Sequence, residues 1–362
     1  MPPRALLGAT CEAGAYSESA ALQFFSPSSG GGPLRKPPDA AIQLLPTPSF
    51  GAMLDALTSA TATHAAMPIE NSLAGTIHPN LDLLLANPNV SIVGETDFRV
   101  RHCLLGAPDA APGVAIKRVH SHYMALAQCT GYLAGRGLTQ VVAADTAGAA
   151  RALSLGQLGG DGKDDAGSGL RGEEAVIASR RAGDIYGLTV LEEGVEDDAG
   201  NYTRFLILTG GGVGVSRGLG VGWGVGGGDA VKTSVAFTLR NVAGELFRAL
   251  SVFAVSGADL TKVESRHVAT LRLLSEGSNG HGDGASEVIV PLTAAAATGG
   301  MASVPVRDGG GSNEEAERRW GYIFYVDVAH VAGDEGVRIA LMALANAALF
   351  FRVLGTYPRC GP

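Results

Sequence analysis

Short apolar stretches of strand length alternate with helix-like stretches over the first two thirds of the chain. The apolar stretches lie at residues 91–93, 140–143, 175–178 and 204–208, and residues 123–135 have the spacing of a helix. Strands that alternate with helices predict an α/β region.

The pattern is sharper beyond residue 229. Val235, Phe237 and Leu239 alternate with Ala236, Thr238 and Arg240, which predicts one half-buried strand. Asn241 is placed to cap a following helix that ends at Gly257. The residues predicted to share one face of this helix are Leu246, Phe247, Leu250 and Phe253.

Two further strands, a helix and a closing strand are predicted after that helix. The pattern indicates a strand over 259–267, a strand with Phe324, Val326 and Val328 on one face, a helix with Val337, Leu341 and Leu344, and a strand over 351–354. The order βαββαβ predicts a separate ferredoxin-like domain.

Glycine marks the boundaries between these parts. The chain has 52 glycines in 362 residues, about twice the usual share of roughly 7%. Glycine-, serine- and alanine-rich stretches predict loops or linkers over residues 26–38, 154–172, 209–229, 275–284 and 294–313. The GxGxxG frame at Gly222, Gly224 and Gly227 lies inside such a tract rather than between a strand and a helix, so it does not indicate nucleotide binding.

Composition excludes several classes of protein. A net charge of −8 argues against non-specific nucleic-acid binding. The longest nearly apolar run, residues 339–351, is too short for a membrane span, which needs about 18 residues. Four scattered cysteines without a CxxC pair predict neither a metal site nor a disulfide framework. The first 30 residues show no targeting signal, so we expect a cytosolic protein or one whose address segment is missing.

Two polar clusters stand out as candidate chemistry. Residues 68–85 read PIENSLAGTIHPNLDLLL, in which Glu70, Asn71 and Ser72 are consecutive polar residues ahead of a helix-like stretch. They fit a helix-capping turn as well as a binding site. The second cluster, residues 201–205, leads into an apolar strand and fits a helix end, an anion-binding arginine or a strand start.

Two further clusters, at residues 121–122 and 145–148, precede predicted helices. Main-chain N–H groups at helix starts attract anions. Several such starts that converge would hold a small dianion.

In this order, the clusters resemble the prephenate dehydratase family, including its plant and algal arogenate dehydratase form. The resemblance runs through Gly14–Glu18, PIENS, the His102-Cys103-Leu104-Leu105 stretch, Ser121-His122 with Ala125–Cys129, Asp145–Ala150 and the Thr203-Arg204-Phe205 stretch. Beyond the glycine tract, residues 232–267 and the closing VLGTYP are similar to that family's regulatory ACT domain.

The resemblance implies a catalytic region of two periplasmic-binding-protein-like (type II) lobes and a C-terminal ACT domain. The expected boundaries are lobe one at 1–80 and 181–208, lobe two at 81–180, a linker at 209–229, and an ACT domain at 230–362 with an insertion at 274–319. The implied reaction is a decarboxylating dehydration of prephenate or arogenate, which aromatises the ring and needs no cofactor.

The resemblance also assigns roles within the catalytic region. Thr203 is the expected hydroxyl donor to the leaving group, and Glu70 is a candidate acid if burial raises its pKa. A strand-start cap for Thr203 and a structural hydrogen bond for Glu70 remain open. The expected substrate-binding residues, with Phe205 packing beneath the substrate, are Asn71, Ser72, Ser121, His122, Thr146, Asn201, Arg204 and Phe205. His102 is expected in the core.

Phenylalanine is the expected effector of the ACT domain. The residues matched to its site are Asn241, Gly244, Leu246, Asp259, Leu260, Glu264, Ser265 and Arg266. Asp259 and His267 depart from the family's usual residues, and the Asp259 carboxylate would repel the effector's carboxylate, which predicts weakened feedback. Cys11 and Tyr123 are departures in the catalytic region.

The resemblance further implies a homodimer or homotetramer and, in a photosynthetic host, the chloroplast stroma. No nucleic-acid or membrane partner is expected. The alternative function is a non-catalytic two-lobed protein that binds an amino acid or a cyclohexadienyl acid.

Overall fold

The computed structural model describes residues 6–10, 12–25, 42–108, 115–158, 172–210, 229–267 and 321–360. Cys11, the linker at 26–38, most of the linkers at 154–172 and 209–229, and the insertion at 274–319 lie outside these ranges.

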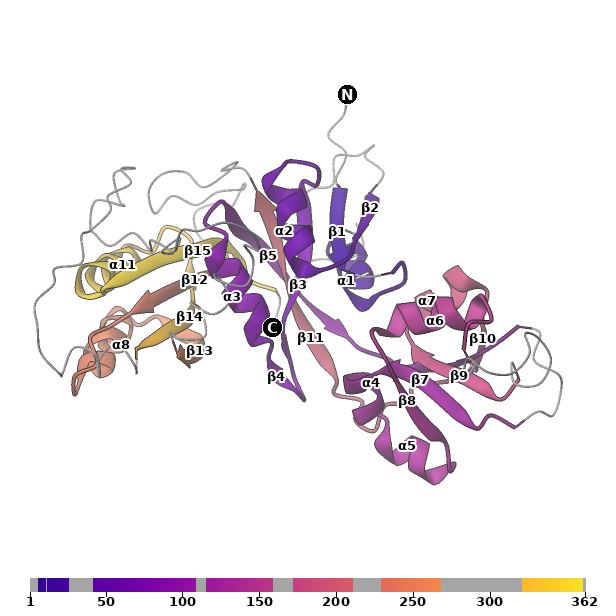
Figure 1. Cartoon of the computed structure of the whole chain (residues 1–362). Helices are drawn as coiled ribbons and strands as arrows, with labels where there is room; N and C mark the ends of the chain where they lie inside the picture. The colour runs from indigo at the N-terminus through magenta and orange to yellow at the C-terminus, as the bar shows by residue number, and fades with distance from the viewer. Residues whose placement is uncertain are drawn as a thin grey trace, which may run out of the picture. The chain divides into compact units, whose positions relative to one another are not determined.

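The first sheet has the strand order β2-β1-β3-β11-β5, with β4 paired to β3 (Figure 1). Its strands are β1 (Leu6–Thr10), β2 (Gln43–Thr47), β3 (His64–Asn71), β4 (Gly75–Thr76), β5 (Val90–Arg99) and β11 (Tyr202–Gly210). The helices that accompany it are α1 (Tyr16–Phe25), α2 (Phe50–Thr58) and α3 (His78–Ala86). Strand β1 is parallel to both β2 and β3, whereas β4 is antiparallel to β3.

The second sheet has the order β10-β6-β9-β7-β8 and contains both parallel and antiparallel pairs. Its strands are β6 (Cys103–Gly106), β7 (Arg118–His122), β8 (Thr139–Ala143), β9 (Glu174–Ala178) and β10 (Thr189–Glu193). Its helices are α4 (Tyr123–Ala127), α5 (Thr130–Gly135), α6 (Thr146–Ser154) and α7 (Arg180–Tyr186). The helix predicted over 123–135 is therefore two helices, with Gln128 and Cys129 between them.

The chain leaves the first sheet, builds the second and returns to the first with β11, as the discontinuous α/β layout predicts. The expected switch points at residues 81 and 181 are wrong, because β5 belongs to the first sheet while α7 and β10 belong to the second. Strand β5 pairs with β11, more than a hundred residues later, and such a pairing leaves no local pattern in the sequence.

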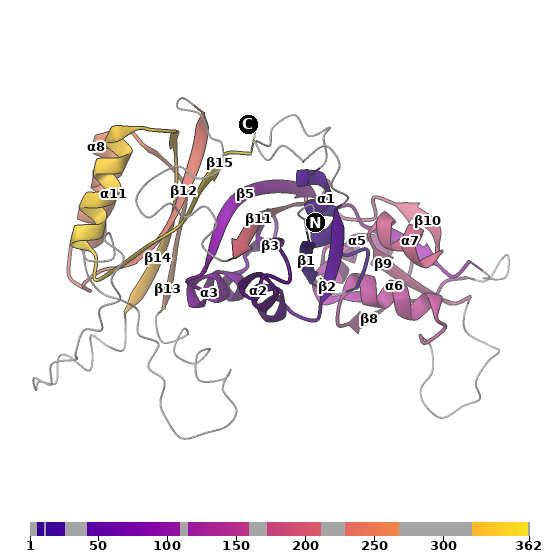
Figure 2. The ribbon, with the colours of Figure 1, turned by 90° about the horizontal axis from the view of Figure 1, so that it is seen from above.

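The third sheet is antiparallel, with the order β13-β14-β12-β15. Its elements are β12 (Ala230–Thr238), α8 (Glu245–Ser256), β13 (Asp259–His267), β14 (Tyr322–Val331), α11 (Glu335–Ala347) and β15 (Phe350–Pro358). This is the predicted βαββαβ order. Helices α8 and α11 lie side by side on one face of the sheet (Figure 2), over a core that includes Val235, Phe237, Phe253, Val326 and Leu344.

One prediction for helix α8 is wrong and another is only half right. Helix α8 is preceded by Gly244, whose φ of +82° places it in the left-handed region, so the glycine rather than Asn241 forms the cap. Of the predicted face, Phe253 is buried and Leu250 packs against the core, whereas Leu246 and Phe247 are exposed to 39% and 77%.

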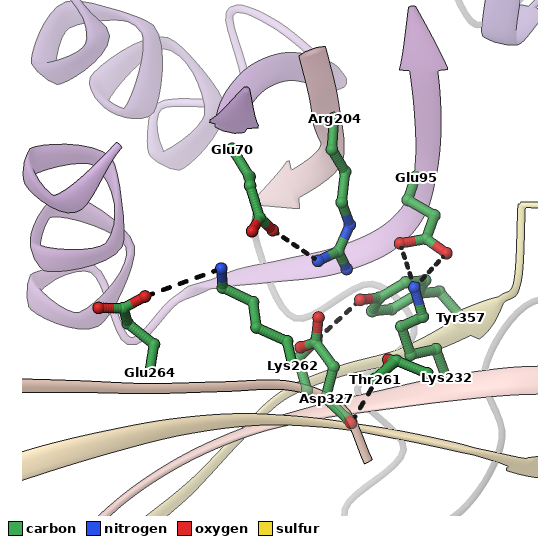
Figure 3. Close-up of polar contacts among 10 residues, drawn as sticks. Glu70, Glu95, Arg204, Lys232, Thr261, Lys262, Glu264, Asp327 and Tyr357 are labelled. Atoms are coloured by element: carbon green, nitrogen blue, oxygen red, sulfur yellow. Dashed lines mark hydrogen bonds and ion pairs between the residues drawn. The ribbon is translucent and has the colours of Figure 1, made fainter. Parts of the chain in front are cut away.

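Strand β12 is buried on both faces rather than half-buried, and even Lys232 is only 8% exposed. The residues that cover the second face belong to the segment Leu81–Glu95, which forms a compact unit with the C-terminal part of the chain. The ammonium of Lys232 lies 2.9 Å from Glu95 Oε2 (Figure 3), and Arg266 lies 3.0 Å from Asp82 Oδ2.

Arg352 ties β15 to the end of helix α3. Its guanidinium donates to the carbonyl oxygens of Leu84, Leu85, Asn87 and Val90 at 2.9–3.2 Å. Leu84 and Leu85 lie in the last turn of α3, where carbonyls lack intrahelical donors, so this side chain satisfies them and also binds two carbonyls beyond the helix. Burial lowers the pKa of Arg352 to about 10, and the main-chain acceptors match the donors of its fork.

Within the described ranges, no helix combines the length and the apolar character needed to cross a bilayer.

Candidate active site

The site is built around Asn71, at the end of β3. The main-chain N–H groups of Leu73 and Ala74 donate to Asn71 Oδ1 at 3.0 and 2.9 Å, which makes the tight turn that the capping interpretation predicts. The amide nitrogen then points the other way, toward β11. It donates to Thr203 Oγ1 at 2.9 Å and to Asn201 Oδ1 at 2.8 Å. One side chain therefore both shapes the PIENS turn and holds the candidate catalytic residue.

Ser72 fixes the same turn to the start of β11. Its hydroxyl donates to the carbonyl of Gly200 at 2.7 Å and accepts from the N–H of Tyr202 at 2.9 Å. The PIENS and TRF clusters, which are about 130 residues apart in sequence, are thus in direct contact. Thr203 itself is 8% exposed. Because its oxygen accepts from Asn71, its hydroxyl hydrogen remains available to donate.

Gln128, between α4 and α5, brings the second sheet's side of the molecule into the cluster. Its Oε1 accepts from Asn201 Nδ2 at 2.9 Å, and its Nε2 lies 3.5 Å from Asn71 Oδ1. A cavity of about 290 Å³ lies beside it. The cavity is lined by Leu73, Ala74, Met124, Ala127, Gln128, Asp197 and Asp198. This volume is near the lower end of the range for small-molecule sites.

The two aspartates on the cavity wall already have main-chain donors. Asp197 accepts from the N–H groups of Gly131 and Tyr132 at 2.9 and 3.2 Å, at the start of helix α5. Asp198 accepts from the N–H of Gly200 at 2.7 Å. These bonds hold the 197–200 turn that leads into Asn201 and Thr203.

Glu70 is half-buried and lies beside an arginine. Its side chain is 37% exposed, and one of its oxygens lies 3.9 Å from the guanidinium of Arg204, whose own side chain is 14% exposed (Figure 3). This geometry gives more support to the structural interpretation of Glu70 than to its interpretation as a catalytic acid. Arg204 faces Glu70 across neighbouring strands, so the structure shows an ion pair where the sequence predicts a substrate carboxylate fork.

The other predicted substrate residues fall into two groups. Ser121 is fully buried and donates to the carbonyl of Ile177 at 2.6 Å, a structural bond across β7 and β9. His122 caps helix α4 by accepting from the N–H of Met124, and Thr146 begins helix α6 behind the Asp145 cap. His122 and Thr146 therefore lie at helix starts, as predicted. Phe205 is 2% exposed and packs in the core.

The Gly14–Glu18 motif lies against the start of helix α7. Ser179 Oγ donates to the carbonyl of Gly14 at 2.7 Å, and Arg181 Nε donates to Glu18 Oε1 at 2.6 Å. Gly14 has a φ of +89°, and a Cβ there would lie 2.7 Å from the Cα of Ala182. At this motif, as at Asn71 and Gln128, the part of the chain that carries the first sheet is in close contact with the part that carries the second.

Sequence reasoning missed three members of the polar cluster: Gln128, Tyr16 and His102. His102, expected in the core, is indeed 2% exposed. Its Nε2 lies 3.0 Å from Gln128 Oε1, and its Nδ1 lies 2.8 Å from the Tyr16 hydroxyl. Tyr16 and Gln128 both lie inside motifs that carry the family resemblance, which is the signal that could have singled them out.

The predicted effector residues do not gather at one place within the chain. Leu260 packs against the helix-covered core, while Arg266 pairs with Asp82 on the opposite face of the sheet. Glu264 lies 4.0 Å from Lys262, also on β13 (Figure 3). Asn241, Asp259 and Ser265 are exposed.

Neither thiol near the cluster is a ready nucleophile. Burial raises the pKa of Cys129 to about 12 and raises the pKa of Cys103 above its usual range. Among the residues that the structure describes, no group of three or more histidine, cysteine or carboxylate side chains could hold a metal ion.

The chain passes from the first α/β sheet to the second and then returns to the first. Polar groups from both parts hydrogen-bond to one another beside a cavity. These features define the class of two-lobed α/β proteins. A family model described as "Prephenate dehydratase" matches residues 5–211. The chain belongs to the prephenate dehydratase family.

Sequence relatives agree with this assignment. The chain is 35% identical over 350 residues to "Arogenate dehydratase/prephenate dehydratase 2, chloroplastic" of Arabidopsis thaliana, an alignment covering 95% of this chain and 70% of that protein. It is 35% identical over 351 residues to "Arogenate dehydratase 2" of Petunia hybrida, covering 95% and 69%.

Solved structures share the whole fold. A prephenate dehydratase from Arthrobacter aurescens in complex with L-Phe has a TM-score of 0.65 at 23% identity, covering 98% of this chain and 90% of that one. A protein titled "GqqA- a novel type of quorum quenching acylases" has the same TM-score at 26% identity, covering 98% and 97%.

Proposed function

We propose that this enzyme removes carbon dioxide and water from arogenate, prephenate or both, giving phenylalanine or phenylpyruvate in L-phenylalanine biosynthesis. The observation that carries the proposal is the Thr203 hydroxyl. It is held by Asn71, which also binds the main chain of Leu73 and Ala74 on the cavity wall, in a chain that belongs to the prephenate dehydratase family.

The leaving hydroxyl needs a donor, because hydroxide is a poor leaving group. Thr203 accepts one hydrogen bond from Asn71 and keeps its own hydrogen for the substrate oxygen. A threonine hydroxyl is a weak acid, so its contribution is a preorganised hydrogen bond to the developing negative charge. Glu70, half-buried and 3.9 Å from Arg204, is not assigned a part in this step.

Loss of the ring carboxylate is favoured by a site with little water. The amides of Asn71, Asn201 and Gln128 bond mainly to one another, so they are held in place before substrate arrives. Aromatisation of the ring drives the reaction, and no step calls for a cofactor.

The C-terminal βαββαβ part, residues 230–362 with the insertion at 274–319, is proposed as an ACT domain that binds phenylalanine. The catalytic region, residues 1–208, is proposed as periplasmic-binding-protein-like, joined to it by the 209–229 linker. The L-Phe complex of the Arthrobacter aurescens protein supports an effector site. A homodimer or homotetramer and a location in the chloroplast stroma complete the proposal, the latter supported by relatives named chloroplastic.

The test is turnover by the purified chain with arogenate and with prephenate, each with and without phenylalanine. Thr203→Val removes the hydroxyl while keeping the shape of the side chain, and Thr203→Ser keeps the hydroxyl. We expect Thr203→Val to lower kcat about 100- to 1,000-fold, and Thr203→Ser to retain most of the activity. Melting temperature and substrate binding should change little in either variant.

Two outcomes would contradict the proposal. Binding of both substrates without product would favour the alternative, a non-catalytic binding protein. Hydrolysis of an acylated amine would instead favour the acylase activity named for the 26% identical structure. The site does not favour acyl transfer, because the hydroxyls of Ser72 and Ser121 both donate to main-chain carbonyls rather than to a histidine base.

A further inference from the structure

The orientation of every amide in the polar cluster follows from two main-chain N–H groups. Leu73 N and Ala74 N can only donate, so the atom of Asn71 that faces them is its oxygen. The Asn71 nitrogen therefore faces Asn201, and the Asn201 side chain must turn its oxygen to Asn71 and its nitrogen to Gln128. The Gln128 oxygen then accepts a hydrogen bond from the Asn201 nitrogen.

The same logic fixes the protonation of His102. Gln128 Oε1 is an acceptor, so the His102 nitrogen 3.0 Å away, Nε2, carries the hydrogen. In the neutral ring Nδ1 is then an acceptor, and the Tyr16 hydroxyl 2.8 Å away donates to it in preference to the carbonyl of Arg101, which lies 3.1 Å from the same hydroxyl. Burial lowers the pKa of His102, which keeps the ring neutral near pH 7.

The ring of His102 is also held in place from its main chain. Its N–H donates to Glu196 Oε2 at 2.8 Å, and its carbonyl accepts from Gly194 and Val195 at 2.9 and 3.1 Å. The Tyr16 ring packs edge-on against it at a centroid distance of 5.5 Å. A rigid ring with a fixed tautomer is a precise support for a neighbouring flexible side chain.

We propose that Tyr16 and His102 are positioning residues that lock the side-chain amide of Gln128, so that its NH2 group faces Asn71 and the cavity. This inference rests on the proposed dehydratase function and assigns a task to the Gly14–Glu18 motif and to the histidine before Cys103. Without the His102 donor, the Gln128 oxygen keeps the hydrogen bond from Asn201 but loses its second donor, so the amide is held less firmly in the same orientation.

The test compares two replacements of similar length. His102→Gln can place an N–H group where Nε2 lies, whereas His102→Met cannot. One lost hydrogen bond of ordinary strength corresponds to about tenfold in rate. We expect His102→Met to lower kcat/KM about tenfold and His102→Gln to restore it to within about threefold. Tyr16→Phe should lower kcat/KM about threefold. The control is Tyr132→Phe, which should leave kcat/KM unchanged, because the Tyr132 hydroxyl binds Glu192 on the second sheet.

A double variant separates positioning from packing. If Tyr16 acts through His102, Tyr16→Phe should have no further effect on kcat/KM in the His102→Met background, while its effect on the melting temperature persists. Additive losses in kcat/KM, or full activity in His102→Met, would overturn the inference and leave the dehydratase function intact.

A measurement independent of turnover tests the tautomer of His102 and its hydrogen bond to Tyr16. Nitrogen-15 NMR of histidine-labelled protein should show the neutral Nε2–H tautomer for His102, and Tyr16→Phe should shift its Nδ1 resonance. An Nδ1–H tautomer would overturn the inference whether or not the chain is active. An inactive wild type with the expected tautomer would instead count against the proposed function.

Discussion

Gly14 is a residue whose replacement the structure restricts on two separate grounds. Its φ of +89° is costly for any side chain, and a Cβ would press on the main chain of Ala182. We expect Gly14→Ala to lower the free energy of unfolding by about 2 kcal/mol or more, because a left-handed conformation alone costs about 1–2 kcal/mol. Chemical denaturation of the purified variant measures this.

Gly51 offers the matched control. It lies inside helix α2, and a Cβ there would meet only Ser49 Oγ at 3.7 Å, an ordinary contact. Gly51→Ala should therefore stabilise the protein by about 0.5–1 kcal/mol. Equal effects at the two positions would show that the conformation at Gly14 is not strained by a side chain.

Buried histidines make the protein sensitive to mild acid. Burial lowers the pKa of His64, His102 and His122 below the ordinary value of about 6.5. Between the lowered and the ordinary pKa the unfolded chain binds more protons, so the stability should be constant above about pH 7 and fall as the pH drops below about 6.5. Denaturant midpoints at pH 7.5, 6.5 and 5.5 test this. His64→Gln should make the decline shallower, and a midpoint that rises toward pH 5.5 would contradict the prediction.

Individual site residues were predictable only where a motif identified them. Asn71 and Thr203 were expected at the site through the PIENS and TRF motifs, and the structure joins them. The link from Tyr16 to His102 crosses 86 positions, and the link from Gln128 to Asn201 crosses 73. A chain of hydrogen bonds between distant side chains has no periodicity, so the pattern of apolar positions cannot show it.

Elements with one buried face were predicted well. Strand β13 has its predicted bounds, and helix α11 buries the predicted Val337, Leu341 and Leu344. Strand β12 was only partly predicted, because its alternation describes the face toward the helices and its second face is buried by residues 81–95. The cap at Asn241 failed because a left-handed glycine, Gly244, begins the helix without a side-chain bond.

The ion pair on the second face of β12 should contribute strongly to the stability of the protein. Glu95 is 5% exposed and receives the Lys232 ammonium at 2.8–2.9 Å. Removing one partner of a buried pair costs about 3–5 kcal/mol, because the remaining charge stays buried. Lys232→Met should therefore destabilise the C-terminal unit by about this amount, measured by thermal or chemical unfolding.

Removing both charges should recover most of that loss. In the double variant Lys232→Met with Glu95→Gln, the glutamine oxygen can still accept from the N–H of Cys360. If the double variant is as unstable as Lys232→Met alone, the charge on Glu95 is not the cause. Arg338→Met, which breaks an exposed pair with Glu335 on helix α11, should leave the stability nearly unchanged.

At the scale of the molecule, the two compact units do not follow the sequence boundary at residue 209. The segment Leu81–Glu95 groups with the C-terminal part of the chain. A fragment that ends at residue 210 would expose Asp82, Glu95 and the apolar surface around Ile92. We expect this fragment to aggregate or to bind a hydrophobic dye, as seen by size-exclusion chromatography and dye fluorescence.

A deletion elsewhere should be harmless by comparison. His267 and Tyr322 are directly paired at the adjoining ends of β13 and β14, so a short Asn-Gly turn can join them. Replacing residues 268–321 with such a turn should leave the melting temperature within a few degrees of wild type. A large loss would show that the replaced residues stabilise the fold.

The succession of α/β region and βαββαβ part was visible in the sequence, whereas the points at which the chain changes sheet were not. The order of the elements depends on local periodicity, whereas the points at which the chain changes sheet depend on pairings between distant strands, such as β5 with β11.

The contacts of Arg352 also bear on how the protein is made. The carbonyls that end helix α3 leave the ribosome more than 250 residues before the guanidinium that binds them. During translation this stretch waits for its partner until Arg352 has been made. A ribosome that stops before Arg352 would therefore release a chain in which the contacts of residues 84–90, far from the point of arrest, are left unformed.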